Sequence, residues 1–261
     1  MRPLLLDKAI LAGVRRISPR LQAIYLPGMG QRMELAEEAS SVFQEVFIDQ
    51  IYKPIDPLPP GANIIDLGAH LGMFSIYASG LSQGARIQAV EANPNTIPLL
   101  RANLERARNH PSFDIIQAAI SGRPGTLTFR LHATRRAHVG GTAVRDTGKF
   151  SDASEFIDVE VKTIQLSSLL SKPADLMKCD IEGAEYGVLT PNTLKPDLIR
   201  QAAVEFHDIG PRAAEFEAIV GGAMARGYRV FTAESQPISD MNALSNHTRG
   251  VDNTITLKFA A

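Results

Sequence analysis

Short apolar runs that alternate with helix-like segments constrain the fold of this chain more than any other feature. The run Asn63–Gly68 (NIIDLG) is almost continuously apolar, which is typical of a strand buried on both faces of a parallel sheet. Helix-like segments lie at 71–81 and 212–226, and Asn93-Pro94 predicts the start of another helix. Strands that alternate with helices indicate an α/β fold with right-handed crossovers. We expect seven core strands, at 63–68, 86–91, 113–120, 175–179, 202–206, 228–233 and 254–259.

A proline-rich stretch at 54–61 (PIDPLPPG) divides the chain. Residues 1–53 are predicted to form an N-terminal helical extension or lid, and residues 54–261 a single Rossmann-like domain. Within the extension, the segment 9–25 is amphipathic and basic. It is expected to pack on the main domain or, as an alternative, to contact an acidic membrane surface.

The main domain contains one long polar insertion. Strand-like runs at 125–131 and 156–164 flank a glycine-containing loop at about 130–156, and loops in such positions often bind substrates. Arg135 and Arg136 in this loop are suited to a carboxylate or phosphate group. The alternative is a solvated connection with no role in recognition.

Composition excludes several classes of protein. The 27 basic and 28 acidic side chains among 261 residues give a net charge of −1, which argues against nucleic-acid binding. One cysteine, Cys179, cannot form an internal disulfide, and it is expected to be a core residue. No run reaches the ~20 apolar residues of a transmembrane helix. We therefore expect a cytoplasmic protein whose oligomeric state the sequence leaves open.

The loop after the first core strand predicts a nucleoside ligand. A dinucleotide fingerprint that begins at Gly68 requires glycine two and five positions later, where this chain has His70 and Met73. The loop therefore lacks a pyrophosphate cradle. Glu91 follows Gly68 by 23 positions, where a carboxylate can bind a ribose diol. Together with Asp66, it forms an acidic pocket suited to the positive charges of S-adenosylmethionine.

Five runs carry a resemblance to a known family, and they are 65–75 (IDLGAHLGMFS), 89–94 (AVEANP), 100–104 (LRANL), 118–121 (AAIS) and 178–185 (KCDIEGAE). Together they resemble FkbM-type S-adenosylmethionine-dependent methyltransferases, over about 43–206. The resemblance implies a class I methyltransferase with a mostly parallel seven-stranded sheet flanked by helices. It also implies a cofactor site formed by Asp66, Gly68, Ala69, Gly72, Glu91, Asn93 and the backbone near Ala119.

Four other residues are candidates for the cofactor site. Ala92 follows Glu91, where the family usually has proline, and Asp180 ends the fourth core strand. His70 either contacts the cofactor or faces solvent. Tyr52, just before the proline-rich stretch, either covers the cofactor or packs in the core.

Polar residues at the ends of two core strands predict the catalytic site. Asp180 and Glu182 follow the fourth strand, and Glu205 and His207 end the fifth. If the two strands are neighbours, the i, i+2 spacing brings all four side chains together. His207 is the first candidate for a general base and Asp180 the second, while Glu205 and His207 would contact the substrate. Alternatively, Glu182 caps the next helix, or the four residues bind a divalent metal.

These expectations combine into one enzymatic hypothesis. The chain is expected to transfer a methyl group from S-adenosylmethionine, leaving S-adenosylhomocysteine, to a hydroxyl of a small molecule such as a sugar or natural product. The residues 180–183 (DIEG) lack the Asn/Asp-Pro-Pro-aromatic pattern of amino-group methylation. The alternatives are a non-catalytic module that binds the same cofactor and an NAD(P)-dependent oxidoreductase, which His70 and Met73 disfavour. Dependence on a divalent metal stays open.

Overall fold

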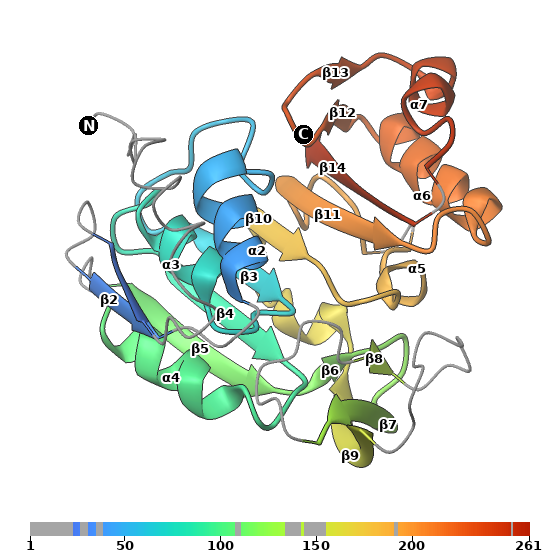
Figure 1. Ribbon diagram of the computed structural model, residues 1–261. Helices are drawn as coiled ribbons and strands as arrows, with labels where there is room; N and C mark the ends of the chain where they lie inside the picture. Colours follow the sequence, from blue (N-terminus) through green and yellow to red (C-terminus); the bar gives the residue numbers. More distant parts are fainter. Residues whose placement is uncertain are drawn as a thin grey trace.

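The computed structural model describes residues 23–26, 31–34, 39–107, 111–133, 142–143, 155–190, 193–251 and 253–261. Its main sheet (Figure 1) has the strand order β13 (Pro237–Ile238), β12 (Arg229–Thr232), β14 (Thr254–Ala260), β11 (Gln201–His207), β10 (Leu176–Cys179), β3 (Asn63–Leu67), β4 (Arg86–Glu91) and β5 (Ser112–Gln117).

The direction of the strands agrees with the sequence-based expectation. Neighbouring strands from β5 to β11 are parallel, whereas β14 is antiparallel to both β11 and β12. The mostly parallel sheet of seven strands is thus confirmed, and the two-residue strand β13 adds an eighth at its edge. Because β10 and β11 are direct neighbours, the polar residues at their carboxyl ends lie together.

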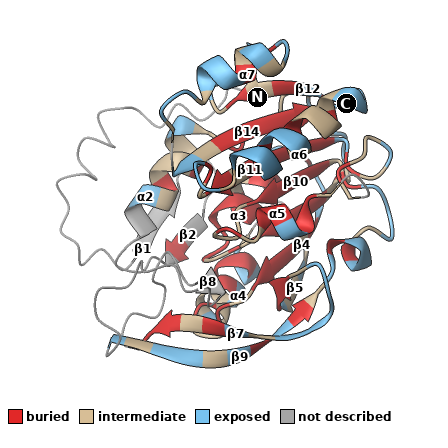
Figure 2. Ribbon diagram, turned by 90° about the vertical axis from the view of Figure 1, so that its right-hand side faces the viewer, coloured by how far each residue is buried: buried red, intermediate tan, exposed pale blue. Residues whose placement is uncertain are grey.

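Helices cover both faces of this sheet, and apolar residues of the strands alternate between them. On one face, Ile64 belongs to a core with Phe74 and Leu100 from α3 (Met73–Ser79) and α4 (Ile97–Glu105). On the other, Ile65 belongs to a core with side chains of α5 (Glu185–Val188), α6 (Ala213–Ala225) and α7 (Met241–His247). Figure 2 shows the buried residues concentrated in the central strands. No helix in the described residues is long and apolar enough to span a membrane.

The helix expected at Asn93 begins later. Asn93 accepts a hydrogen bond on its side-chain oxygen from the backbone N–H of Asn95, which closes a turn instead of capping a helix. Helix α4 starts at Ile97, with Thr96 at the N-cap position and a proline in its first turn. The proline that fixes the first turn is therefore Pro98 and not Pro94.

A second sheet has the order β6 (Ala119–Ile120), β9 (Phe156–Ile164), β7 (Gly125–His132) and β8 (Thr142–Ala143). The strands expected at 125–131 and 156–164 are confirmed as the antiparallel pair β7–β9. The prediction of a single strand at 113–120 is wrong in its extent. Strand β5 ends at Gln117, and β6 pairs with β9 in the second sheet. Arg135 and Arg136 lie outside the described residues.

The N-terminal region contains a hairpin as well as helical segments. Strands β1 (Ala23–Leu26) and β2 (Gln31–Glu34) pair antiparallel, so the extension contains strands in addition to the helical segments expected there. Ile24 and Tyr25 favour a strand. Helix α2 (Ala39–Phe43) and the π-helical segment η2 (Gln44–Asp49) follow. The predicted domain boundary at 53/54 stays a prediction.

Candidate active site

A pocket that is partly open to solvent lies at the carboxyl ends of β3, β4 and β10. This is the edge at which open α/β sheets bind ligands. The candidates that line it are Tyr52, Gly68, Ala69, His70, Glu91, Ala92, Asn93, Ala119, Asp180 and Glu182. Four other candidates are not among the lining residues, and they are Asp66, Gly72, Glu205 and His207.

Two glycines shape the loop after β3 for different reasons. Gly68 has φ +76°, and a Cβ there would lie 1.9 Å from the carbonyl oxygen of Asp180. Gly72 has φ +82°, and its Cβ would lie 2.9 Å from Leu100 and Leu104 of α4. Glycine at 68 thus lets the loop approach the end of β10, whereas glycine at 72 serves helix packing. Gly72 is not among the residues that line the pocket, and its contact with the cofactor stays a prediction.

Glu91 ends β4 and organises the opposite wall of the pocket. Its Oε2 accepts a hydrogen bond from the His70 N–H and its Oε1 accepts one from the Asn93 N–H, each at 2.7 Å. Because each carboxylate oxygen has a second lone pair, the anchored side chain can still accept hydrogen bonds from a ligand. Apolar side chains line other parts of the pocket, namely Val42, Val46, Leu127 and Phe129.

Asp66 is buried beneath the pocket loop and is not one of the residues that line the pocket. Its side chain is fully buried, accepts a hydrogen bond from Ser75 Oγ at 2.7 Å and lies 3.9 Å from Lys178 Nζ. Burial raises the pKa of Asp66, and the charge of Lys178 opposes that shift. Strand β3 turns this side chain toward the buried lysine, and the expectation that Asp66 lines the cofactor stays a prediction.

Lys178 is a pocket residue that sequence reasoning missed. Although buried, its Nζ donates to the carbonyl oxygen of Gly68 at 2.8 Å and lies 3.1 Å from Asp180 Oδ2. Burial by itself lowers the pKa of Lys178, but Asp180 and Asp66 raise it above its usual value. Lys178 is thus charged, and it ties the glycine loop to the end of β10. A lysine inside an otherwise apolar strand was the signal available in the sequence.

Tyr52 connects the segment before the main domain to the polar residues Asp180, after β10, and Glu205, on β11. It is 2% exposed, and its hydroxyl donates to Glu205 Oε2 and lies 3.4 Å from Asp180 Oδ2. Burial, followed by the charges of these two carboxylates, raises the pKa of Tyr52. Burial and the charge of Asp180 likewise raise the pKa of Glu205, to about 7. Tyr52 packs against Phe74 and also lines the pocket, and the expectation that it covers the cofactor stays a prediction.

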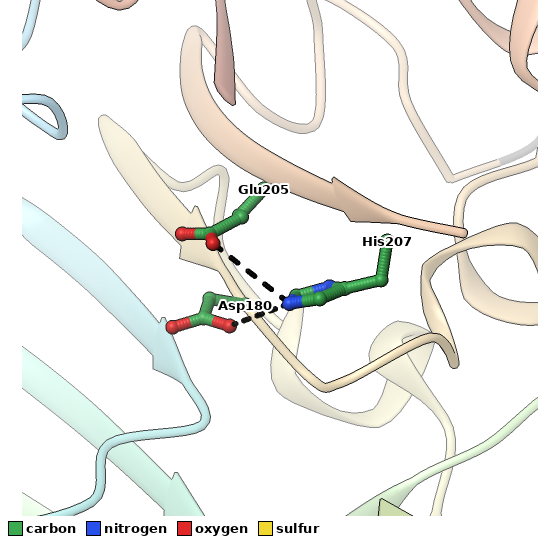
Figure 3. A group of neighbouring side chains, drawn as sticks. All are labelled: Asp180, Glu205 and His207. Atoms are coloured by element: carbon green, nitrogen blue, oxygen red, sulfur yellow. Dashed lines mark ion pairs between the residues drawn. The ribbon is translucent and has the colours of Figure 1, made fainter. Parts of the chain in front are cut away.

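His207 lies at the centre of the polar cluster (Figure 3). Its Nε2 is 3.9 Å from Asp180 Oδ1, 3.7 Å from Glu182 Oε2 and 3.8 Å from Glu205 Oε1. The convergence expected from the i, i+2 spacing is therefore found. Burial by itself lowers the pKa of His207, but its bond to Glu185 and the nearby charges raise it to about 9. At neutral pH the imidazole of this arrangement carries a proton, and only its neutral form can act as a base.

Glu185 is a second residue that sequence reasoning left without a role. Its fully buried carboxylate accepts hydrogen bonds on Oε1 from the N–H groups of Ile181 and Gly183, at 3.1 Å each, and Oε1 lies 3.0 Å from His207 Nδ1. Glu185 thus fixes the loop between β10 and α5, and α5 itself has no side-chain cap. Glu182 instead has φ +55°, a left-handed conformation that is costly for a residue with a side chain.

Comparison with known proteins shows a family to which this chain is similar. Residues 66–230 match the family described as "Methyltransferase FkbM domain". The "31-O-demethyl-FK506 methyltransferase FkbM" of Streptomyces tacrolimicus is 28% identical over 232 residues, which cover 78% of this chain and 86% of that protein. "Methyltransferase sdnD" of Sordaria araneosa is 29% identical over 211 residues, covering 70% and 80%. Among solved structures, a precorrin-6y C5,15-methyltransferase from Geobacter metallireducens GS-15 superposes with a TM-score of 0.41 at 15% identity, covering 82% and 86%.

Proposed function

This chain belongs to the FkbM methyltransferase domain family, and we propose that it transfers a methyl group from S-adenosylmethionine to a hydroxyl oxygen of a small molecule. The name of one relative, a 31-O-demethyl-FK506 methyltransferase, describes methylation of an oxygen on a natural product. The observation that carries the hydroxyl assignment is the cluster of Asp180, Glu205 and His207 beside the pocket, which offers proton acceptors to an acceptor molecule.

The described residues fit the proposed cofactor. Glu91 presents carboxylate oxygens at the end of β4, where they can accept hydrogen bonds from the two ribose hydroxyls. Ala119 and the apolar residues Leu127 and Phe129 line the same pocket and suit a planar base. Asp180 and Glu182 bring negative charge to the pocket, which favours a positively charged sulfonium.

Catalysis then depends on positioning and on removal of one proton. The cofactor, when bound, supplies an electrophilic methyl carbon on a positively charged sulfur. The pocket holds the acceptor oxygen in line with that carbon, and positioning of this kind lowers a barrier by several kcal/mol, up to about 7–11 kcal/mol. His207 in its neutral form, or Asp180, takes the hydroxyl proton. Glu205 contributes a hydrogen bond to the acceptor.

Calorimetry with S-adenosylmethionine and S-adenosylhomocysteine tests the cofactor. We expect both to bind, and we expect Glu91→Ala to weaken both at least about tenfold, the loss of ~1.4 kcal/mol. Glu217→Ala, on the exposed face of α6, is the matched control. Binding of NAD(P) in place of these ligands would support the oxidoreductase alternative and reject the proposal.

A turnover assay tests the acceptor atom. The protein is incubated with cofactor carrying a ¹³C-labelled methyl group and with a panel of hydroxylated sugars and polyketides, and the products are analysed by NMR. A labelled methyl group on oxygen supports the proposal. Labelled methyl groups only on nitrogen or carbon contradict it, and cofactor binding without turnover across the panel favours a non-catalytic module.

A further inference from the structure

The atoms around His207 Nε2 are spaced for a shared ion. The distances from Nε2 to single oxygens of Asp180, Glu182 and Glu205 are 3.7–3.9 Å, longer than a hydrogen bond. Ligand atoms of Asp180, Glu205 and His207 all lie within 4.8 Å of one another. Two bonds of about 2.1–2.4 Å to a common cation span separations of this size. Figure 3 shows these three side chains directed toward one another.

The other polar atom of each main ligand is already held by the protein. Asp180 Oδ2 lies 3.1 Å from Lys178 Nζ, Glu205 Oε2 accepts from the Tyr52 hydroxyl, and His207 Nδ1 lies 3.0 Å from Glu185 Oε1. Metal-binding histidines and carboxylates typically have their second atom fixed in this way. The arrangement leaves His207 Nε2, Asp180 Oδ1 and Glu205 Oε1 to face the same point.

The side chain that carries Nε2 supplies an observation independent of the carboxylates. His207 is 8% exposed, so its imidazole is held inside the protein with Nε2 directed at the acidic oxygens (Figure 3). Because Nδ1 already lies 3.0 Å from Glu185 Oε1, Nε2 is the ring nitrogen left to bind a ligand.

The balance of charge around this point also favours a cation. The carboxylates of Asp180, Glu182, Glu205 and Glu185 all lie within 4 Å of the His207 ring nitrogens. Lys178 neutralises one of these charges through Asp180. The remaining surplus of negative charge in a partly buried site is costly unless a positive charge compensates it.

We infer that Asp180, Glu205 and His207, with Glu182 as a fourth ligand, bind a divalent cation at the edge of the pocket. Three carboxylates and one imidazole suit Mg²⁺ or Mn²⁺. Since Asp180 and Glu182 also line the pocket, the cation lies where an acceptor hydroxyl can complete its coordination. With the cation bound, His207 Nε2 and Asp180 Oδ1 would be its ligands and would not take the proton. The cation would orient the hydroxyl and lower its pKa, and the proton would pass to solvent at the open pocket. This catalytic role rests on the proposed function, whereas binding of the cation does not.

Titration of the chelator-treated full chain with Mn²⁺, followed by electron paramagnetic resonance, tests the site without cofactor or acceptor. We expect one bound Mn²⁺, competition by Mg²⁺, and a ¹⁴N coupling in the pulsed spectrum from His207. The variants His207→Gln and Glu205→Gln should each weaken binding more than about tenfold, and His207→Gln should remove the nitrogen coupling. Glu217→Gln is the control.

The alternative to a bound cation is a protonated His207, and the same titration distinguishes these two states. Absence of Mn²⁺ binding at millimolar concentration, or binding that both variants leave unchanged, overturns the inference. If a ligand variant fails to fold by circular dichroism, Glu182→Gln, whose side chain is 32% exposed, replaces it and should weaken binding about tenfold. Cofactor binding and methyl transfer are measured separately. Metal binding without O-methylation rejects the proposed function alone, and O-methylation without metal binding rejects this inference alone.

Discussion

The Oε1 atom of Glu185 lies 3.0 Å from Nδ1 of His207 and also accepts hydrogen bonds from two backbone N–H groups in the loop between β10 and α5. One fully buried carboxylate therefore fixes both the loop after β10 and the orientation of the imidazole at the end of β11. The stability of the fold and the protonation of His207 therefore both depend on Glu185.

The variant Glu185→Gln keeps an oxygen for the two N–H groups and removes the charge beside His207. The pKa of His207, raised to about 9, should fall. A raised pKa contributes stability in full below the unfolded value of about 6.5, and that contribution disappears as the pH rises through about 9. The variant should therefore lose about 2 kcal/mol near pH 6 and much less near pH 10. Urea unfolding at the two pH values measures this, and equal losses would contradict it.

The variant Lys178→Met tests the buried ammonium. It leaves Asp66 and Asp180 without their cation and removes the donor to Gly68. Removal of one partner from a buried ion pair costs about 3–5 kcal/mol, so a large fall in the free energy of unfolding is expected. Lys172→Met, at an exposed position, should change stability by less than about 0.5 kcal/mol. A similar effect of both variants would show that Lys178 has no structural role.

Two glycines with nearly the same backbone conformation form a matched pair. Gly68 has φ +76° and its added Cβ meets the Asp180 carbonyl, whereas Gly61 has φ +71° and no atom within 4 Å of its added Cβ. Gly61→Ala should cost about 1–2 kcal/mol from backbone strain alone. Gly68→Ala should cost several kcal/mol more and weaken cofactor binding. Thermal unfolding and calorimetry measure both effects, and equal costs would mean that the loop can move away from β10.

The variant Tyr52→Phe separates packing from hydrogen bonding. The ring can still pack against Phe74, while Glu205 Oε2 loses its donor. Since that bond favours the ionised carboxylate, the pKa of Glu205 should rise further. We expect a loss of stability of about 1 kcal/mol and a fall in kcat for methyl transfer greater than any rise in the KM for cofactor. Tyr77→Phe is the control, and unchanged kcat in Tyr52→Phe would exclude a positioning role.

Lys258 on β14, which does not line the pocket, gives a prediction about how the stability of the protein depends on pH. It is 2% exposed, and burial, followed by the charge of Lys53, lowers its pKa to about 8. The folded protein therefore loses this proton before the unfolded chain does, and stability should rise between about pH 8 and 10.5. Lys258→Met should stabilise the protein by about 1–3 kcal/mol below pH 8 and flatten this rise. A variant less stable than the parent at neutral pH would show that the bond to Ser235 outweighs burial.

Sequence reasoning was most reliable where hydrophobic periodicity decides the structure. The buried strands β3, β4 and β10 lie where apolar runs placed them, because a strand covered on both faces needs such a run. It was less reliable where tertiary pairing decides. The run 113–120 is suited to a strand throughout, yet Gln117 and Ala119 belong to different sheets, a choice made by distant partners.

The same distinction applies to the site. The convergence of Asp180 with Glu205 could be predicted, since neighbouring parallel strands bring their carboxyl ends together. The roles of Lys178 and Glu185 could not, because each depends on partners from other elements. The contact of Asp66 with the buried lysine could not be predicted for a related reason, since it depends on a side chain from a neighbouring strand.

The hydroxyl of Tyr52 reaches across to Glu205 on β11, although 153 positions separate the two residues. An engineer who exchanges residues 1–53 for those of a relative therefore also changes the hydrogen bonding of Glu205, unless a tyrosine is kept at position 52. Acceptor preference and the identity of the leading segment are thus expected to be inherited together.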